Sequence, residues 1–434
     1  MSVLSRRRAA VVVAVALAVV VTVMAVVIGS DDSSTVRSAS TTTTSTSRPT
    51  STLPVDPEAP ETAPVTSAPV TTTGPPVTPN GRFTIVGGDI VGPDGKVFVP
   101  MGANMAVRQG GYEEGYAFNW NGTGTGHVDD VLAWGWNTVR ATLVCLPTGS
   151  PSTDELNAGI DDFIQEYTAK HVVVIVECHD ITLKNYGVSS PQVQGLYAFW
   201  DRLAQKWHDN PYVWFNTFNE PIGDATPAAV TDWLALQRDA LKRLRAVAPT
   251  SVFVADIPGG GQAVDAFAAK DSIRQLSAGQ CNVLYSWHAY GALGNHGVFG
   301  KFADYDNEQA SRANHEAALK YLRDNRIPLV VGEVGDPLTL NEGTAGQPIW
   351  NRIGGRAVIQ LAPKYGIGML WWHATGDSGV FLTYSLMADR HAPPWAAATT
   401  GEGLSDTGRL FWDASKQQPA PQPFTGDLST SNCG

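Results

Sequence analysis

The fold is decided by residues 213–221, whose sequence reads Val-Trp-Phe-Asn-Thr-Phe-Asn-Glu-Pro. The apolar start of this stretch indicates a buried strand over Val213–Asn219, and polar side chains stand where that strand stops. A helical pattern precedes it from Val193 to Trp207, with apolar residues three and four positions apart. A buried strand that alternates with an amphipathic helix is typical of a parallel sheet covered on both faces.

The same alternation extends through residues 81–434, with another helix expected over Thr153–Lys170. Eight strands are predicted: Met101–Asn104, Thr138–Val144, Val172–Glu177, Val213–Asn219, Val252–Asp256, Val283–Tyr290, Leu329–Glu333 and Ile367–Trp372. Eight such units close into a (β/α)8 TIM barrel, preceded here by a short hairpin of Phe83–Val86 with Val97–Pro100. An open doubly wound sheet is the alternative, but no Gly-x-Gly-x-x-Gly follows the first strand, so no dinucleotide cofactor is expected.

Polar and aromatic side chains stand at the ends of successive predicted strands. They are Asn104, Arg140, His179, Asn219, Glu220, His288, Tyr290, Glu333 and Trp372. In a barrel the carboxyl ends of all strands face one mouth. We therefore expect these side chains to converge on one site.

Two of these residues, Glu220 and Glu333, carry carboxyl groups that could catalyse a reaction together. Glycoside hydrolysis needs one carboxyl group to protonate the leaving oxygen and a second to attack the anomeric carbon or activate water. Taken singly, Glu220 before a proline also suits a helix start, and Glu333 also suits a structural ion pair. Their joint position after strands four and seven, with Arg140 available to keep one of them ionised, favours catalysis.

The chain from residue 83 to residue 412 resembles glycoside hydrolase family 5, the cellulase and mannanase family of clan A barrels. The resemblance is carried by Asn219-Glu220-Pro221, His288-x-Tyr290, Gly332-Glu333-x-Gly335 and the Gly-x-Gly-Met-Leu-Trp-Trp run at 366–372. It implies a retaining hydrolase that needs no cofactor and acts on a β-1,4-linked polysaccharide or oligosaccharide.

The resemblance also implies a division of work in the site. Glu220 would be the acid/base and Glu333 the nucleophile, held by Arg140 and Tyr290. Asn219 would hydrogen-bond the sugar 2-hydroxyl. We expect Arg140 to lower the pKa of the nucleophile, whereas the acid/base, which must stay protonated until attack, needs a less cationic setting.

Four more residues are expected to bind substrate. By the same resemblance His179 and His288 would line the subsite nearest the cleaved bond, and Trp372 would lie under the sugar ring. Asn104, at the end of the first strand, is counted with them.

Short segments around the predicted site reduce the number of candidate substrates. Residues 137–140, 176–182 and 286–291 are similar to the bacterial β-mannanase branch of the family, whereas Pro221 is the cellulase-like choice. We expect β-1,4-mannan or glucomannan before cellulose-type glucan. An exo-acting β-glucosidase, a glycolipid glycosidase and a catalytically inactive carbohydrate-binding barrel stay open as alternatives.

Residues 1–30 predict export. Three arginines at 6–8 precede an uncharged run, Ala9–Ile28, which at about 1.5 Å per residue reaches roughly 30 Å, the thickness of a hydrocarbon core. Basic residues before the run keep the amino end inside, so the rest of the chain lies outside. A single-pass signal anchor, which would contact the membrane, and a cleaved signal peptide of a secreted protein both remain open.

Residues 31–80 differ in composition from everything after them. Of these 50 residues 31 are Ser, Thr or Pro and none is aromatic. Such a segment buries too little apolar area to offset the entropy cost of ordering, so we expect a disordered linker. The catalytic barrel is then residues 81–434.

The net charge of −11 arises wholly in residues 81–434 and argues against a nucleic-acid partner, because phosphate contacts need a basic face. We expect a monomer.

Metal ligands are imaginable in Cys145, Cys178, His179 and Asp180, but the chain has no Cys-x-x-Cys or His-x-x-x-His pair. No metal is therefore expected.

Four cysteines in an exported domain allow three pairings. Cys145 and Cys178 follow neighbouring strands, while Cys281 precedes the sixth strand and Cys433 lies beside the carboxyl terminus. We expect these two pairs as disulfides. Free buried thiols are the alternative for Cys145 and Cys178, because adjacent strand ends do not guarantee bridging geometry.

Overall fold

The computed structural model describes residues 81–106, 128–147, 159–269, 273–294, 296–300, 307–335, 349–374, 386–389, 394–431 and 433. The expectations for residues 1–30 and 31–80 lie outside these ranges. Among the described helices none has both the length and the apolar character needed to cross a membrane.

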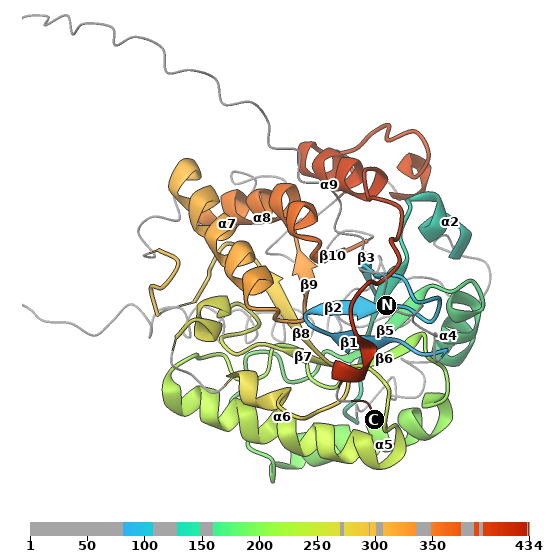
Figure 1. Cartoon of the computed structure of the whole chain (residues 1–434), viewed down its shortest axis with the longest axis vertical. Helices are drawn as coiled ribbons and strands as arrows, with labels where there is room; N and C mark the ends of the chain where they lie inside the picture. The colour runs from blue at the N-terminus through green and yellow to red at the C-terminus, as the bar shows by residue number, and fades with distance from the viewer. Residues whose placement is uncertain are drawn as a thin grey trace, which may run out of the picture. The chain divides into compact units, whose positions relative to one another are not determined.

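Eight parallel strands close into a barrel in the order β10-β3-β4-β5-β6-β7-β8-β9 (Figure 1). They are β3 Met101–Ala106, β4 Thr138–Leu143, β5 Val173–Cys178, β6 Val213–Asn216, β7 Phe253–Asp256, β8 Val283–Ala289, β9 Leu329–Val334 and β10 Gly368–Trp371. Each matches one predicted strand, which confirms the (β/α)8 barrel. β6 ends earlier than expected because the chain turns after Asn216, whose side-chain amide donates to the Phe218 carbonyl oxygen at 3.3 Å.

Helices surround the barrel. They are α2 Val128–Ala133, α4 Ile160–Ala169, α5 Pro191–Trp207, α6 Pro227–Val247, α7 Glu308–Asp324, α8 Ile349–Leu361 and α9 Asp406–Lys416. Short 3-10 turns lie between them: η1 Val264–Phe267, η2 Ile273–Leu276, η4 Ala362–Tyr365, η5 Pro394–Ala397 and η6 Leu428–Thr430. The expected helix over Thr153–Lys170 corresponds to α4, and residues 151–158 lie outside the described ranges.

Side-chain caps set the starts of several of these helices. Ser190, Thr226, Asn307 and Ser405 each accept a hydrogen bond from the backbone N–H three residues further on. In α5 and α6 a proline follows the cap, where its missing N–H costs no helical hydrogen bond. Local sequence therefore sets where these helices begin.

The predicted hairpin is present, but the prediction of its second strand is wrong. β1 (Thr84–Val86) pairs antiparallel with β2 (Asp89–Val91), not with residues 97–100. The register leaves a two-residue turn, Gly87-Gly88, and both glycines take the positive φ that such a turn requires. Residues 93–95 form a separate turn, after which Lys96 bridges to Pro423 and Val97 bridges to Val91.

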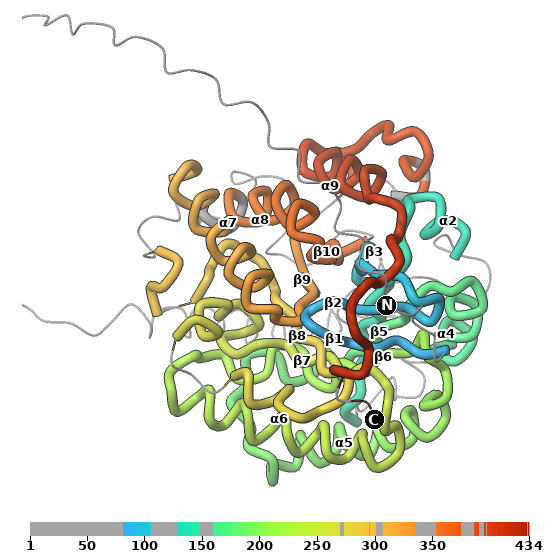
Figure 2. Tube along the Cα trace, in the orientation of Figure 1, coloured from blue at the N-terminus to red at the C-terminus, as the bar shows by residue number. Residues whose placement is uncertain are grey.

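The hairpin closes the amino-terminal end of the barrel. Phe83 packs edge to face on Trp214 of β6, with ring centroids 5.1 Å apart. The side chain of Asn282, just before β8, accepts from the Ile85 N–H at 2.8 Å and donates to the Phe83 carbonyl oxygen. Figure 2 shows the carboxyl-terminal segment crossing the hairpin, and the Phe424 N–H donates at 3.0 Å to the carbonyl oxygen of Gly95, in the turn that follows β2.

Each end of the barrel has one disulfide bond. Cys281 and Cys433 are bonded beside the hairpin at the amino-terminal end, and Cys145 and Cys178 are bonded after β4 and β5 at the carboxyl-terminal end. The expected pairing is confirmed. Because both sulfurs of the second pair are used in this bond, they are not available as thiolate ligands for a metal.

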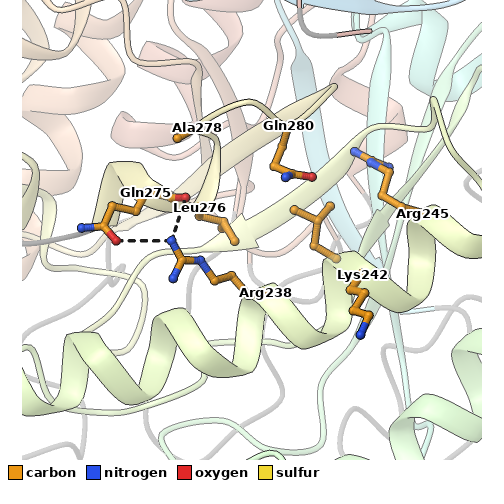
Figure 3. Close-up of a pocket in the computed structure, with 8 residues that line it drawn as sticks. Arg238, Lys242, Arg245, Gln275, Leu276, Ala278 and Gln280 are labelled. Atoms are coloured by element: carbon orange, nitrogen blue, oxygen red, sulfur yellow. Dashed lines mark hydrogen bonds between the residues drawn. The ribbon is translucent and has the colours of Figure 1, made fainter. Parts of the chain in front are cut away.

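A pocket of about 390 Å³ lies on the outside of the barrel, between α6 and η2 (Figure 3). Arg238 reaches across it and donates to the carbonyl and side-chain oxygens of Gln275, both at 3.3 Å. None of the residues predicted for the active site lines this pocket.

Candidate active site

The interior of the barrel changes chemistry from one end to the other. Toward the amino-terminal end it is lined by Val173, Ile175, Trp214, Val252, Val254, Leu284, Val330 and Leu370. Side chains in a strand alternate, so the next inward positions lie two residues further on. There the buried residues are Glu177, Asn216, Asp256 and Ser286. Buried polar groups must be paired, so this single step along the strands locates the polar site at the carboxyl-terminal end.

Glu333, in β9, is held by two strong donors. Arg140 Nη1 donates to Glu333 Oε1 and the Tyr290 hydroxyl donates to Glu333 Oε2, both at 2.7 Å. The side chain is nearly buried. Its orientation therefore depends on β4 and on the segment that follows β8, which are distant in sequence.

Glu220 follows β6 in an unusual backbone conformation. Its φ is +41°, a left-handed value that a residue with a side chain before a proline rarely adopts. The Glu220 N–H donates to Asp256 Oδ2 at 3.0 Å, and its carbonyl oxygen accepts from the Leu183 N–H at 2.9 Å. Strain of this kind persists where surrounding contacts impose it, and functional sites are where it concentrates.

Arg140 is the centre of the buried network. Besides Glu333 it donates to Asn104 Oδ1 (2.9 Å), Asn216 Oδ1 (2.9 Å) and Asn219 Oδ1 (2.8 Å). Burial disfavours its charge, but the carboxylates of Glu177, Asp256 and Glu333 outweigh burial and raise its pKa above the ordinary value. The guanidinium is thus a permanent cation with a fixed orientation.

Asn104 is fully buried beneath this network rather than at the mouth. Its amide donates to the carbonyl oxygens of Gly332 (2.9 Å) and Trp371 (3.2 Å), and its oxygen accepts from Arg140. All of its hydrogen-bonding groups are therefore used within the protein. The geometry gives it the position of a support for Arg140, not of a substrate contact.

Burial and charge act in opposite directions on the nucleophile candidate. Burial raises the pKa of Glu333, and the cations His288 and Arg140 oppose that rise without cancelling it. Arg140 lowers the pKa of Glu333, as expected. Burial raises it by more, so the net pKa of Glu333 lies above the ordinary value.

Glu220 has one cationic partner, His288, whereas Glu333 pairs with Arg140 and also lies near His288, so the setting of Glu220 is the less cationic of the two, as expected. Burial disfavours charge on His288, yet the carboxylates of Glu333 and Asp256 raise its pKa to about 10. His288 is therefore an imidazolium at neutral pH, and its Nδ1 lies 2.8 Å from Glu220 Oε1. One side-chain atom each of Glu220, His288 and Glu333 lies within 4.8 Å of the others, and a metal ion bound there would have to displace a proton from His288.

His179, Trp372 and Asn219 form one side of the site. The rings of His179 and Trp372 stack with centroids 5.1 Å apart. Burial opposes charge on His179, but Glu177 outweighs it and raises the His179 pKa. Asn219 Nδ2 donates to Thr182 Oγ1 at 2.8 Å. The structure thus gathers these three residues at the mouth, as strand-end positions predict.

Three residues of the network were missed in the sequence: Glu177, Asn216 and Asp256. All are fully buried and all face Arg140. Each stands at the end of a predicted strand or within it, so the rule that singled out Arg140 and Glu333 applies to them equally. Glu177 was hidden because it continues an apolar run, and Asp256 because no familiar motif surrounds it.

The two glutamates lie close together. An oxygen of Glu220, which follows β6, and an oxygen of Glu333, in β9, are within 4.8 Å of each other although the two strands are three apart in the barrel order. Paired carboxyl groups at the mouth of a (β/α)8 barrel, one of them held by arginine and tyrosine, define a glycoside hydrolase.

The comparison with protein families agrees. Residues 103–378 match the model of the cellulase family, glycosyl hydrolase family 5, and the chain belongs to that family. It is 27% identical over 301 residues to a mannan endo-1,4-beta-mannosidase of Streptomyces lividans, covering 69% of this chain and 67% of that protein.

A second mannan endo-1,4-beta-mannosidase, from Cellvibrio japonicus, is 25% identical over 252 residues, which is 57% of this chain and 51% of that protein. Among solved structures, the catalytic domain of a mannanase from Streptomyces sp. SirexAA-E superposes with a TM-score of 0.53 at 22% identity. The superposition covers 80% of this chain and 99% of that domain, and it shows the fold.

Proposed function

We propose that this chain is a retaining glycoside hydrolase of β-1,4-mannan or glucomannan that works outside the cell. The observation that carries the proposal is the short separation of Glu220 and Glu333, whose nearest oxygens lie within 4.8 Å. Retaining enzymes hold their carboxyl groups about 5–5.5 Å apart, whereas inverting enzymes leave about 6.5–9.5 Å for a water molecule.

In the proposed mechanism the ionised Glu333 attacks the anomeric carbon. Arg140 and the Tyr290 hydroxyl hold its two oxygens, so the lone pair of the attacking oxygen is aimed from a fixed position. Glu220 protonates the leaving oxygen as the glycosidic bond breaks, and a glycosyl ester forms on Glu333. Glu220 then takes a proton from water, which attacks the ester and releases the sugar with its original configuration.

The substrate preference rests on two supports. The curated relatives in the comparison are both mannan endo-1,4-beta-mannosidases, and the sequence around residues 137–140, 176–182 and 286–291 resembles the bacterial β-mannanase branch of the family. Pro221 points the other way, toward cellulase. Mannose differs from glucose at the axial 2-hydroxyl, so discrimination depends on donors placed near that oxygen.

Two features support an extracellular location. Both cysteine pairs are disulfides, and such bonds persist in oxidising compartments. The uncharged run at residues 9–28 has the composition of a signal peptide or signal anchor.

Two measurements test the proposal. NMR of the first-formed product from a β-linked substrate should show the β anomer, and a first-formed α anomer would assign the enzyme to the inverting class. Initial rates on mannohexaose and cellohexaose at equal concentration test the substrate. A higher rate on cellohexaose would overturn the mannan preference and leave the mechanism intact.

A further inference from the structure

Asp256, the last residue of β7, has a fully buried carboxylate at the centre of the site. Its Oδ1 accepts from Asn216 Nδ2 at 3.1 Å. Its Oδ2 accepts from the Glu220 N–H at 3.0 Å and lies 3.3 Å from Arg140 Nη2 and 3.3 Å from His288 Nε2. Burial disfavours its charge, but His288 and Arg140 outweigh burial and hold the pKa of this carboxyl well below its usual range.

Two of these contacts lead to Glu220. One is direct, because Asp256 anchors the backbone N–H of the strained Glu220. The other passes through His288, whose Nε2 faces Asp256 while its Nδ1 lies 2.8 Å from Glu220 Oε1. The two paths end on the backbone and on the side chain of the same residue.

Glycines hold the histidine ring in this orientation. A Cβ on Gly261 would come within 2.7 Å of His288 Cγ, and a Cβ on Gly332 would come within 3.4 Å of His288 Nε2. The Gly261 carbonyl oxygen also accepts from the His288 N–H at 2.8 Å. The ring therefore fits closely between β9 and the turn that follows β7, and it has little room to turn away from Asp256.

We propose that Asp256 is a positioning residue that acts through the acid/base Glu220, by keeping His288 doubly protonated and directed at Glu220 Oε1. The proposal rests on the roles assigned above to Glu220 and Glu333. With a donor on Oε1, the acidic proton of Glu220 is confined to Oε2, the oxygen left free for the leaving group. A neutral His288 would offer Nδ1 as an acceptor and take that proton out of the reaction path.

The charges around His288 set the sign of the pH effect. The ring faces three carboxyl groups, Asp256 from β7, Glu333 from β9 and Glu220 after β6. Arg140, on β4, pairs with Asp256 and Glu333. Removing the Asp256 charge leaves His288 one fewer anionic neighbour, so the ring loses its proton at lower pH. The basic limb of activity should move to lower pH with it.

Asp256→Asn, which keeps the size of the side chain, is tested on two substrates. Mannohexaose has a poor leaving group and needs the acid, whereas a dinitrophenyl β-glycoside does not. We expect kcat/KM to fall roughly 10- to 100-fold on mannohexaose and by less than about threefold on the dinitrophenyl substrate. On mannohexaose the basic limb of the pH profile should shift to lower pH.

Asn216→Asp combined with Asp256→Asn keeps one buried carboxylate beside Arg140, because Asn216 already accepts from Arg140 Nε. This double variant should fold even if the single variant does not, and it should show the same difference between the substrates. Asp265→Asn is the matched control: Asp265 is a buried aspartate whose Oδ2 accepts from the N–H groups of His296 (2.7 Å) and Gly297 (3.1 Å). It should change both substrates equally and leave the pH profile in place.

Equal losses on both substrates with an unshifted basic limb, in the single or the double variant, would overturn the inference. That result would leave the proposed function standing. The proposed function fails separately, if the wild-type protein cleaves neither substrate or if Glu333→Ala keeps full activity.

Discussion

The two ends of the barrel are built from the same strands, but one end is filled with apolar side chains and the other with polar and charged ones. At the amino-terminal end, Phe83 and Trp214 pack ring against ring, and the hairpin and carboxyl-terminal segment cover them. At the other end, two residues further along β6 and β7, the interior holds the amide of Asn216 and the carboxylate of Asp256, both bonded to Arg140. Apolar packing stabilises the first end, whereas the second accepts the cost of buried charge to orient reactive groups. Changes at the closed end should therefore alter stability, and changes at the polar end should alter rate.

The largest effect is expected at the polar end. Glu333→Ala should lower kcat by roughly 10³-fold or more, because no group is left to form the covalent intermediate. Added azide should restore part of the turnover of an activated substrate and yield the α-glycosyl azide. Glu316→Gln, at a partly exposed glutamate that pairs with Lys364, is the control and should leave kcat unchanged. Full activity in Glu333→Ala would contradict the view that the polar end of the barrel determines the rate.

The next effect is expected at the closed end. Phe83→Ala removes a buried ring that contacts Phe98, Tyr212 and Trp214, and should lower the free energy of unfolding by about 3–5 kcal/mol. Urea unfolding measures this change, and kcat/KM of the folded variant should match the wild type. Leu132→Ala, at an exposed leucine on α2, should change stability by less than about 1 kcal/mol. A loss of kcat/KM in folded Phe83→Ala would mean that the two ends are coupled.

The disulfides allow a finer comparison of the ends. The Cys281–Cys433 bond joins residues 152 apart and the Cys145–Cys178 bond joins residues 33 apart. In the chain-entropy model they stabilise by about 5 and about 4 kcal/mol, so removing the first with paired serine substitutions should cost roughly 1 kcal/mol more. Only loss of the second, which lies beside His179, should also lower kcat. The reverse order of stabilities would show that native-state effects, not loop length, dominate.

A further expected effect at the polar end is a pH dependence of stability from His288. Its pKa rises from 6.5 to about 10 on folding, so its contribution is fully present below pH 6.5 and is lost as the pH rises toward 10. The free energy of unfolding, measured in urea from pH 6 to pH 10, should decline over this interval. The decline should be shallower in His288→Gln. An equal slope in both proteins would assign the pH dependence to other groups.

Local sequence was sufficient for the barrel and for the location of the site. Continuous apolar runs such as 172–176 are buried strands wherever they pack, and Ser190 and Thr226 cap their helices through neighbours three residues away. The strand-end rule also found Glu220 and Glu333, because a parallel barrel places all carboxyl strand ends at one mouth. These inferences need only the period of the pattern and the direction of the strands.

Only the tertiary structure decided which polar groups pair with which. Asn104 and Trp372 both stand at strand ends, yet Asn104 lies beneath Arg140 while Trp372 stacks on His179. The net pKa direction of Glu333 and the partners of the Asp256 carboxylate were likewise out of reach of the sequence. Each depends on burial and on charges brought together from different strands, and Coulomb energy and desolvation vary with distances that no local pattern encodes.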